Sequence, residues 1–79
     1  MPAAMFSHIG DQIAKIRKMK GLTIEELAKK TGLYPLRVAQ IEAGQVRATT
    51  DELYQIKTAL GVDLKDLYRD MPPDDDPFK

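Results

Sequence analysis

The chain has 79 residues, 43% hydrophobic and 30% charged, which predicts one small domain near the lower size limit for a core without cross-links. It contains no cysteine. This excludes disulfides and thiolate metal sites and favours a reducing compartment, so we expect a cytoplasmic protein. The N-terminus lacks a basic leader, and no segment approaches the ~18 apolar residues that span a bilayer. We therefore expect neither secretion nor a membrane partner.

The charges separate along the chain although the formal net charge is zero. Residues 1–48 carry eight Lys and Arg against four Asp and Glu, whereas residues 49–79 carry four against eight. A basic front half joined to an acidic rear half is typical of a DNA-binding face with an unrelated rear surface. Ordinary solvated helix faces explain the same distribution, so the charge alone leaves both interpretations open.

The first predicted helix carries apolar residues at steps of four and three, namely Ile9, Ile13, Ile16 and Met19. We expect this stripe to be core, with Ser7 capping the helix and Gly21 ending it. Residues 1–7 are then an N-terminal arm, and residues 8–71 form the folded domain.

Two further helices are predicted to follow in a helix-turn-helix arrangement. Thr23 and Glu26 have the spacing of a capping box, which starts a helix at Ile24. Gly32 can adopt the left-handed conformation that ends this helix, and Pro35 suits the first turn of the next one. The apolar positions expected to pack the two helices together are Leu27, Ala28, Val38 and Ile41.

The rest of the chain predicts two more helices and a tail. Gly44 stops the third helix, and Thr49 with Glu52 forms a second capping box for a fourth helix that ends at Gly61. Asp63 can cap a last short helix, which the prolines at 72 and 73 end. Residues 72–79 are expected to be a disordered acidic tail. The predicted fold is all-α, with five helices.

From Ile9 to Leu67 the chain resembles the phage-repressor type of helix-turn-helix domain, called Cro/C1-type or XRE-type. The matching segments are 21–23, 25–28, 32–33, Val38, 40–42, Gly44 and 60–62. The resemblance implies a compact five-helix, lambda-repressor-like domain that dimerises and lays its third helix in the major groove. Its two half-sites would lie about one helical turn apart, ~34 Å. It also implies that Arg17 pairs internally with Glu42 rather than with a phosphate.

The chain departs from the family pattern at positions that usually contact DNA. Ile24 stands where a glutamine usually touches a phosphate, and Pro35 and Leu36 occupy positions that are commonly polar. Leu36 can contact a thymine methyl, Gln40 can pair with adenine, and Arg37 can reach guanine or a phosphate. With few hydrogen-bonding groups on the reader helix, DNA shape is expected to carry more of the specificity.

The candidate site residues form two sets. Those expected at DNA are Thr23, Tyr34, Pro35, Leu36, Arg37, Gln40, Gln45 and Arg47. Thr23 is first a helix cap, although a helix N-terminus also suits a phosphate, and Tyr34 either stacks on the sugar–phosphate edge or covers Leu33. The expected dimer interface consists of Tyr54, Val62, Leu64 and Tyr68.

The sequence favours a homodimeric transcription regulator, a repressor acting on an inverted repeat in double-stranded DNA, without a cofactor. Regulation by a protein partner is a further expectation. The competing interpretation is an antitoxin-like or accessory protein-interaction module, because Ile24, Pro35 and Leu36 place apolar groups where DNA contacts are expected. An enzyme is not expected, because the chain has neither a cysteine nor a histidine pair nor a glycine-rich phosphate loop.

Overall fold

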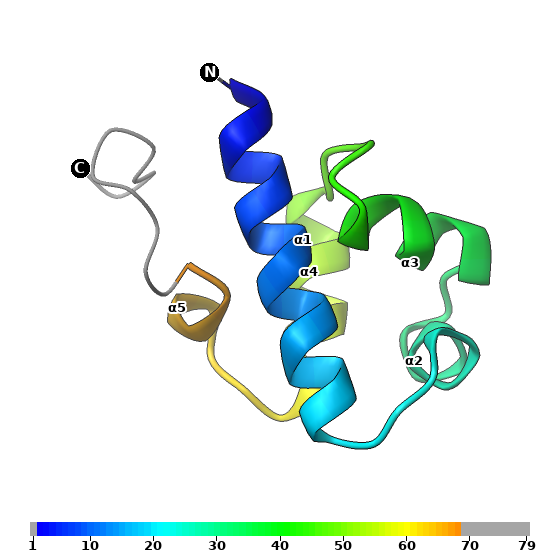
Figure 1. Cartoon of the computed structure of the whole chain (residues 1–79). Coiled ribbons are helices and arrows are strands. Elements are labelled where there is room, and N and C mark those ends of the chain that lie inside the picture. The colour runs from blue at the N-terminus through cyan, green and yellow to red at the C-terminus, as the bar shows by residue number, and fades with distance from the viewer. Residues whose placement is uncertain (1, 69–79) are drawn as a thin grey trace.

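Helix α1 (Pro2–Met19) crosses the middle of the molecule, in front of α4 (Thr50–Leu60) in the view of Figure 1. Helices α2 (Ile24–Thr31) and α3 (Pro35–Glu42) lie on one side of α1, and the single turn α5 (Leu64–Leu67) lies on the other. The computed structural model describes residues 2–68, with side chains from residue 8 onward. Within that range the chain forms helices and turns without a strand, which confirms the predicted all-α fold.

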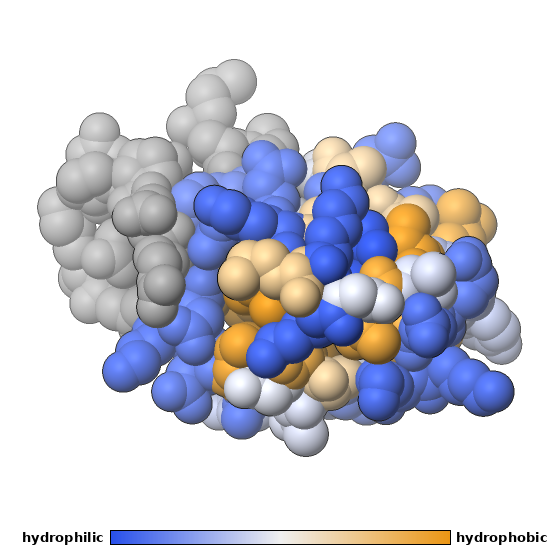
Figure 2. Space-filling model, turned by 60° about the horizontal axis from the view of Figure 1, so that its bottom comes forward, coloured by the Kyte–Doolittle hydropathy of each residue, from blue (hydrophilic) through white to orange (hydrophobic). Residues whose placement is uncertain are grey.

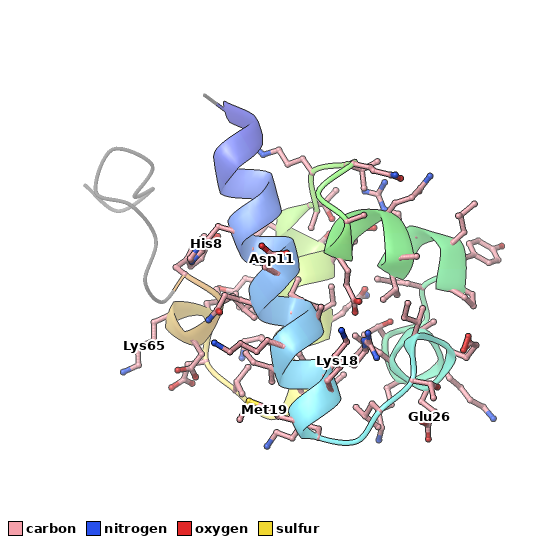
Figure 3. All side chains as sticks on the ribbon, in the orientation of Figure 1. His8, Asp11, Lys18, Met19, Glu26 and Lys65 are labelled. Carbon is pink, nitrogen blue, oxygen red and sulfur yellow. The ribbon has the colours of Figure 1, made fainter. Side chains whose placement is uncertain are left out.

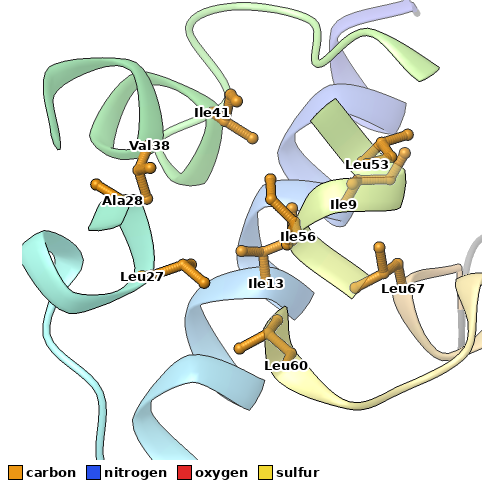
Figure 4. Close-up of a cluster of buried hydrophobic side chains, with 10 residues drawn as sticks. All are labelled: Ile9, Ile13, Leu27, Ala28, Val38, Ile41, Leu53, Ile56, Leu60 and Leu67. Atoms are coloured by element: carbon orange, nitrogen blue, oxygen red, sulfur yellow. The ribbon is translucent and has the colours of Figure 1, made fainter. Parts of the chain in front are cut away.

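All five helices contribute to one hydrophobic core (Figure 4). Ile13 of α1, Leu27 of α2, Val38 of α3, Ile56 of α4 and Leu67 of α5 are fully buried. The remaining buried hydrophobic residues are Ile9, Ala28, Ile41, Leu53 and Leu60. Because the second and third helices pack on α1 and α4, the helix-turn-helix pair is part of the core and not an appendage.

The predicted helix boundaries between residues 23 and 61 are confirmed. The Thr23 hydroxyl accepts the Glu26 backbone N–H at 3.0 Å, and the Glu26 carboxylate accepts the Thr23 N–H at 2.8 Å. Thr49 and Glu52 form the same reciprocal pair at the start of α4, at 3.1 and 2.8 Å. Gly32 ends α2 at φ 76°, a left-handed conformation that is cheap only for glycine. These local signals fix where the turn between α2 and α3 lies.

Two expectations for the first helix are wrong. The helix begins at Pro2 rather than after Ser7, so Ser7 lies inside it and is not its cap. Proline at the first helical position and two alanines after it favour the earlier start. Met19 is 77% exposed rather than core, because it is the last residue of α1 and lies at its end (Figure 3). The expected arm and domain boundaries stay predictions, and the tail lies outside the described residues.

Gly10 marks a close approach between α1 and α3 that the sequence analysis did not single out. A Cβ placed on Gly10 would lie 2.3 Å from the Ile41 carbonyl oxygen and 2.7 Å from that of Glu42. Both neighbours are backbone atoms, so a side chain here would have to push the C-terminal end of α3 away from α1. Glycine at this position therefore allows α3 to lie this close to α1.

Candidate nucleic-acid interface

One face of α3 is turned away from the core and is largely aliphatic. Leu36, Ala39, Gln40 and Ala43 are spaced by three and four residues and therefore share one side of the helix. Leu36 is 68% exposed, and Ala39 and Gln40 are half-buried. Tyr34, directly before the helix, is 82% exposed, and its side chain forms no capping hydrogen bond. Three predicted DNA-binding residues, Tyr34, Leu36 and Gln40, therefore lie on or directly before this face.

The C-terminal end of α3 is tied to α1 by the predicted ion pair between Arg17 and Glu42. Arg17 Nε donates to Glu42 Oε2 at 2.7 Å and Nη2 donates to Oε1 at 3.0 Å, with both side chains 9% exposed. Arg17 Nη1 also donates to the Leu22 carbonyl oxygen at 2.8 Å. The hydrogen bonds that Arg17 donates to the Glu42 carboxylate raise the pKa of Arg17, whereas burial acts in the opposite direction. This confirms that Arg17 is an internal partner of Glu42.

A second ion pair ties the N-terminal half of α3 to α4. Arg37 donates from Nε to Glu52 Oε2 and from Nη2 to Glu52 Oε1, both at 2.8 Å, and Nη2 also reaches the Arg47 carbonyl oxygen at 3.3 Å. Arg37, with the Thr49 N–H, lowers the pKa of Glu52 to about 2. The sequence did not indicate this partner, and Arg37 was expected at guanine or a phosphate. In the structure Arg37 Nε and Nη2 are paired with Glu52, the side chain is 32% exposed, and its contact with DNA stays a prediction.

The sequence indicates only one half of the Arg37–Glu52 pair. Glu52 was recognised as the glutamate of a capping box, which engages one carboxylate oxygen and leaves the other able to accept a second donor. Nothing in the local spacing indicates that the donor is Arg37, because the two residues are 15 positions apart on different helices.

The structure brings together part of the predicted DNA-binding set. The Gln45 N–H donates to the Gln40 carbonyl oxygen at 3.0 Å, and Arg37 holds the Arg47 backbone, so the loop after α3 lies against that helix. Gln45 and Arg47 are both exposed. Thr23 is separate from this group at the start of α2, where it is exposed and engaged in its capping box.

The predicted dimer residues do not form one exposed patch. Tyr54 is 51% exposed, with Lys57 Nζ 5.6 Å from its ring centroid, and it lines a depression of about 340 Å³ between α2 and α4. Val62, Leu64 and Tyr68 are half-buried against the core. Val62 lines another depression of about 280 Å³ between α1 and α5. Their role in dimerisation stays a prediction.

Apolar and charged groups are mixed on the face that contains the α1–α2 turn. Figure 2 shows hydrophobic side chains near the centre of this face, surrounded by hydrophilic ones. The depression between α1 and α5 has the same character, with Ile16 and Met19 beside Lys15 and Lys20. Among residues 2–68 there is no group of acidic, histidine or cysteine side chains that could hold a metal ion, and no helix long and apolar enough to cross a bilayer.

Comparisons with known proteins agree with this architecture. The HTH_3 helix-turn-helix family model matches residues 13–67. The HTH-type transcriptional regulator y4dJ of Sinorhizobium fredii is 34% identical over 70 residues, covering 89% of this chain and 88% of that protein. The restriction-modification controller protein C.AhdI of Aeromonas hydrophila superposes with a TM-score of 0.77 at 29% identity, covering 78% of this chain and 94% of its own.

Cyanate hydratase of Synechococcus elongatus is also similar, with 37% identity over 60 residues. That match covers 76% of this chain but 41% of the enzyme, so most of the enzyme has no counterpart here. The regulators, by contrast, match over nearly their whole lengths. The chain belongs to the HTH_3, or XRE-type, helix-turn-helix family of DNA-binding transcriptional regulators.

Proposed function

We propose that the protein is a homodimeric repressor that binds an inverted repeat in double-stranded DNA. Helix α3 enters the major groove with Leu36 and Gln40, while Gln45 and Arg47 of the following loop approach the backbone. The y4dJ regulator and the C.AhdI controller, which share this architecture, support a regulatory role. The two-fold symmetry of a dimer would place the two half-sites ~34 Å apart.

The observation that carries this proposal is the double attachment of α3. Arg17 and Glu42 fasten one end of the helix to α1, and Arg37 and Glu52 fasten the other half to α4. Each pair makes two charge-assisted hydrogen bonds in a planar, bidentate geometry. A helix held in this way presents its outward side chains in a fixed register, which is what reading base edges requires.

Arg37 has a different role in this proposal from the one expected from the sequence. Arg37 Nε and Nη2 donate to Glu52, and Nη2 also donates to the Arg47 carbonyl oxygen, so in this proposal Arg37 positions α3 and the following loop instead of reading a base. Arg47 is then the main backbone-contacting cation of the loop.

Selection from a pool of random duplexes tests the proposal. A repressor should enrich an inverted repeat and prefer it over random duplex by at least ~10³ at physiological salt, because phosphate attraction alone gives only ~10⁻⁴–10⁻⁶ M binding. Sedimentation should show dimers at micromolar concentration. A pool that yields no motif, with affinity that falls steadily as salt rises, would contradict sequence-specific regulation.

A second candidate function is a protein-interaction module of the antitoxin or accessory type. The observation in its favour is the exposed apolar pair Tyr34 and Leu36, 82% and 68% exposed. If this function is correct, Leu36→Glu abolishes binding of one stoichiometric protein partner. Met19→Glu, at an exposed apolar residue on the end of α1, serves as the matched control and should leave that binding intact.

A further inference from the structure

We propose that α3 reads its operator through the methyl groups of thymine, with Leu36 as the specificity-determining residue and Gln40 reading a nearby adenine. This inference rests on the proposed DNA-binding function and names the base feature that the helix recognises. Its basis is the small number of polar side chains on the outward face of α3.

Both charged side chains of α3 already form ion pairs with other residues of the chain, although the Arg37 side chain remains 32% exposed. Arg37 is bound to Glu52 and Glu42 is bound to Arg17, each through two hydrogen bonds. On the outward face, Leu36, Ala39 and Ala43 have no hydrogen-bonding side chain, so Gln40 is the one polar side chain of that face. Pro35 and Leu36, the first two residues of α3, are both exposed and apolar.

An aliphatic side chain discriminates between bases by what it covers. In the major groove G·C pairs present polar donors and acceptors, and the C5 methyl of thymine is the apolar group there. Covering a polar edge with Leu36 would remove its water without supplying a hydrogen bond, which is unfavourable. Covering a methyl group instead removes apolar surface from water on both sides. Leu36, at 68% exposure, has most of its side chain available for that contact.

The helix spacing relates the two contacts. Gln40 follows Leu36 by four residues, a rise of about 6 Å along the helix. Since its amide can pair with the N6 and N7 atoms of adenine, each half-site should contain an adenine close to the thymine that Leu36 covers. Each half-site should therefore contain at least these two A·T pairs.

Removing single methyl groups from the operator tests this inference. In the selected duplex, each thymine is replaced in turn by uracil, which deletes the C5 methyl and changes no hydrogen-bonding group. We expect one thymine per half-site whose replacement weakens binding about fourfold, the value for one buried methyl. Leu36→Ala should bind the thymine and uracil duplexes equally, and its exposed position makes it safe for folding, as circular dichroism can verify. The matched control Met19→Ala should retain the fourfold difference.

Methylated cytosine gives an independent readout at the same position. Replacing the critical T·A pair by C·G should weaken binding, and 5-methylcytosine should recover about fourfold in the wild type but not in Leu36→Ala. A selected motif whose affinity is indifferent to every uracil replacement would overturn methyl reading while leaving the regulator intact. Absence of any selected motif would instead overturn the DNA-binding function, and loss of a protein partner in Leu36→Glu would then assign this residue to the interaction module.

Discussion

The buried pair between Arg17 and Glu42 should contribute to stability as a unit, and a double-mutant cycle can measure this. Arg17→Ala leaves the Glu42 carboxylate without its two donors in a site where its side chain is 9% exposed. Glu42→Ala leaves the Arg17 guanidinium with only the Leu22 carbonyl oxygen among these partners. Either single change therefore leaves one buried charge without its counter-charge, whereas the double change removes both charges.

The magnitude follows from that burial. Each single variant should lower the free energy of unfolding by about 3 kcal/mol, and the double variant by about 4 rather than 6, which gives a coupling energy of about 2 kcal/mol. A domain of this size has a total stability of roughly 4–12 kcal/mol. Each kcal/mol corresponds to a shift of about 4–8 °C in Tm, so the single variants should melt at least 12 °C below the wild type.

Urea and thermal unfolding followed by circular dichroism measure all four proteins of the cycle. Lys18→Ala is the matched control, because Lys18 is adjacent to Arg17 but exposed, and its Tm should change by only a few degrees. Arg17→Lys should recover little, because an ammonium cannot reproduce three hydrogen bonds from one planar group. If the losses in Arg17→Ala and Glu42→Ala simply add, the two residues are not coupled and the reasoning is refuted.

Three further predictions test other contacts. Gly10→Ala should destabilise the protein by ~1–3 kcal/mol, because the alanine methyl would meet backbone oxygens of α3. This loss should outweigh the better helix propensity of alanine. Equal or higher stability in urea unfolding would contradict the close approach of α3 to α1. Because the pKa of Glu52 is lowered to about 2, its ionised carboxylate stabilises the fold above about pH 4.5, and this contribution is lost as the pH falls toward 2. We expect the contribution to the free energy of unfolding to be ~1 kcal/mol after allowing for solvent screening at Arg37. A Glu52→Gln variant whose unfolding keeps the wild-type pH dependence would disprove it. Arg47→Ala should weaken binding to all duplexes and lower the salt slope by about one, whereas Gln40→Ala should cost ~1–3 kcal/mol mainly at one base pair; uniform loss from both would show that Gln40 is not a reader.

Local signals predicted most of the fold correctly. The capping boxes at Thr23 and Thr49 and the left-handed Gly32 and Gly61 involve residues within a few positions of each other, so their geometry is written into short stretches of sequence. The pairing of Arg17 with Glu42 was predicted from the family pattern, which carries long-range information that spacing alone does not.

What the sequence did not reveal concerns contacts between elements or the end of an element. Periodicity placed Met19 in the buried stripe, but periodicity does not report where the neighbouring helices stop covering that stripe. Gly10 resembles any glycine in a helical pattern until α3 is placed against it. Arg37 was assigned to DNA because nothing near it in sequence competes for a guanidinium, and Glu52 becomes its partner only when α4 packs beside α3.

The double attachment of α3 also has a thermodynamic consequence for complex formation. A recognition helix that folds or shifts on contact adds an ordering penalty and a large negative heat-capacity change to binding. Here Arg17 of α1 and Glu52 of α4 already hold the helix from both sides, so association should resemble the docking of rigid bodies. Its heat-capacity change should then follow the apolar surface covered at the interface, and binding affinity should depend little on the loss of conformational freedom in the protein.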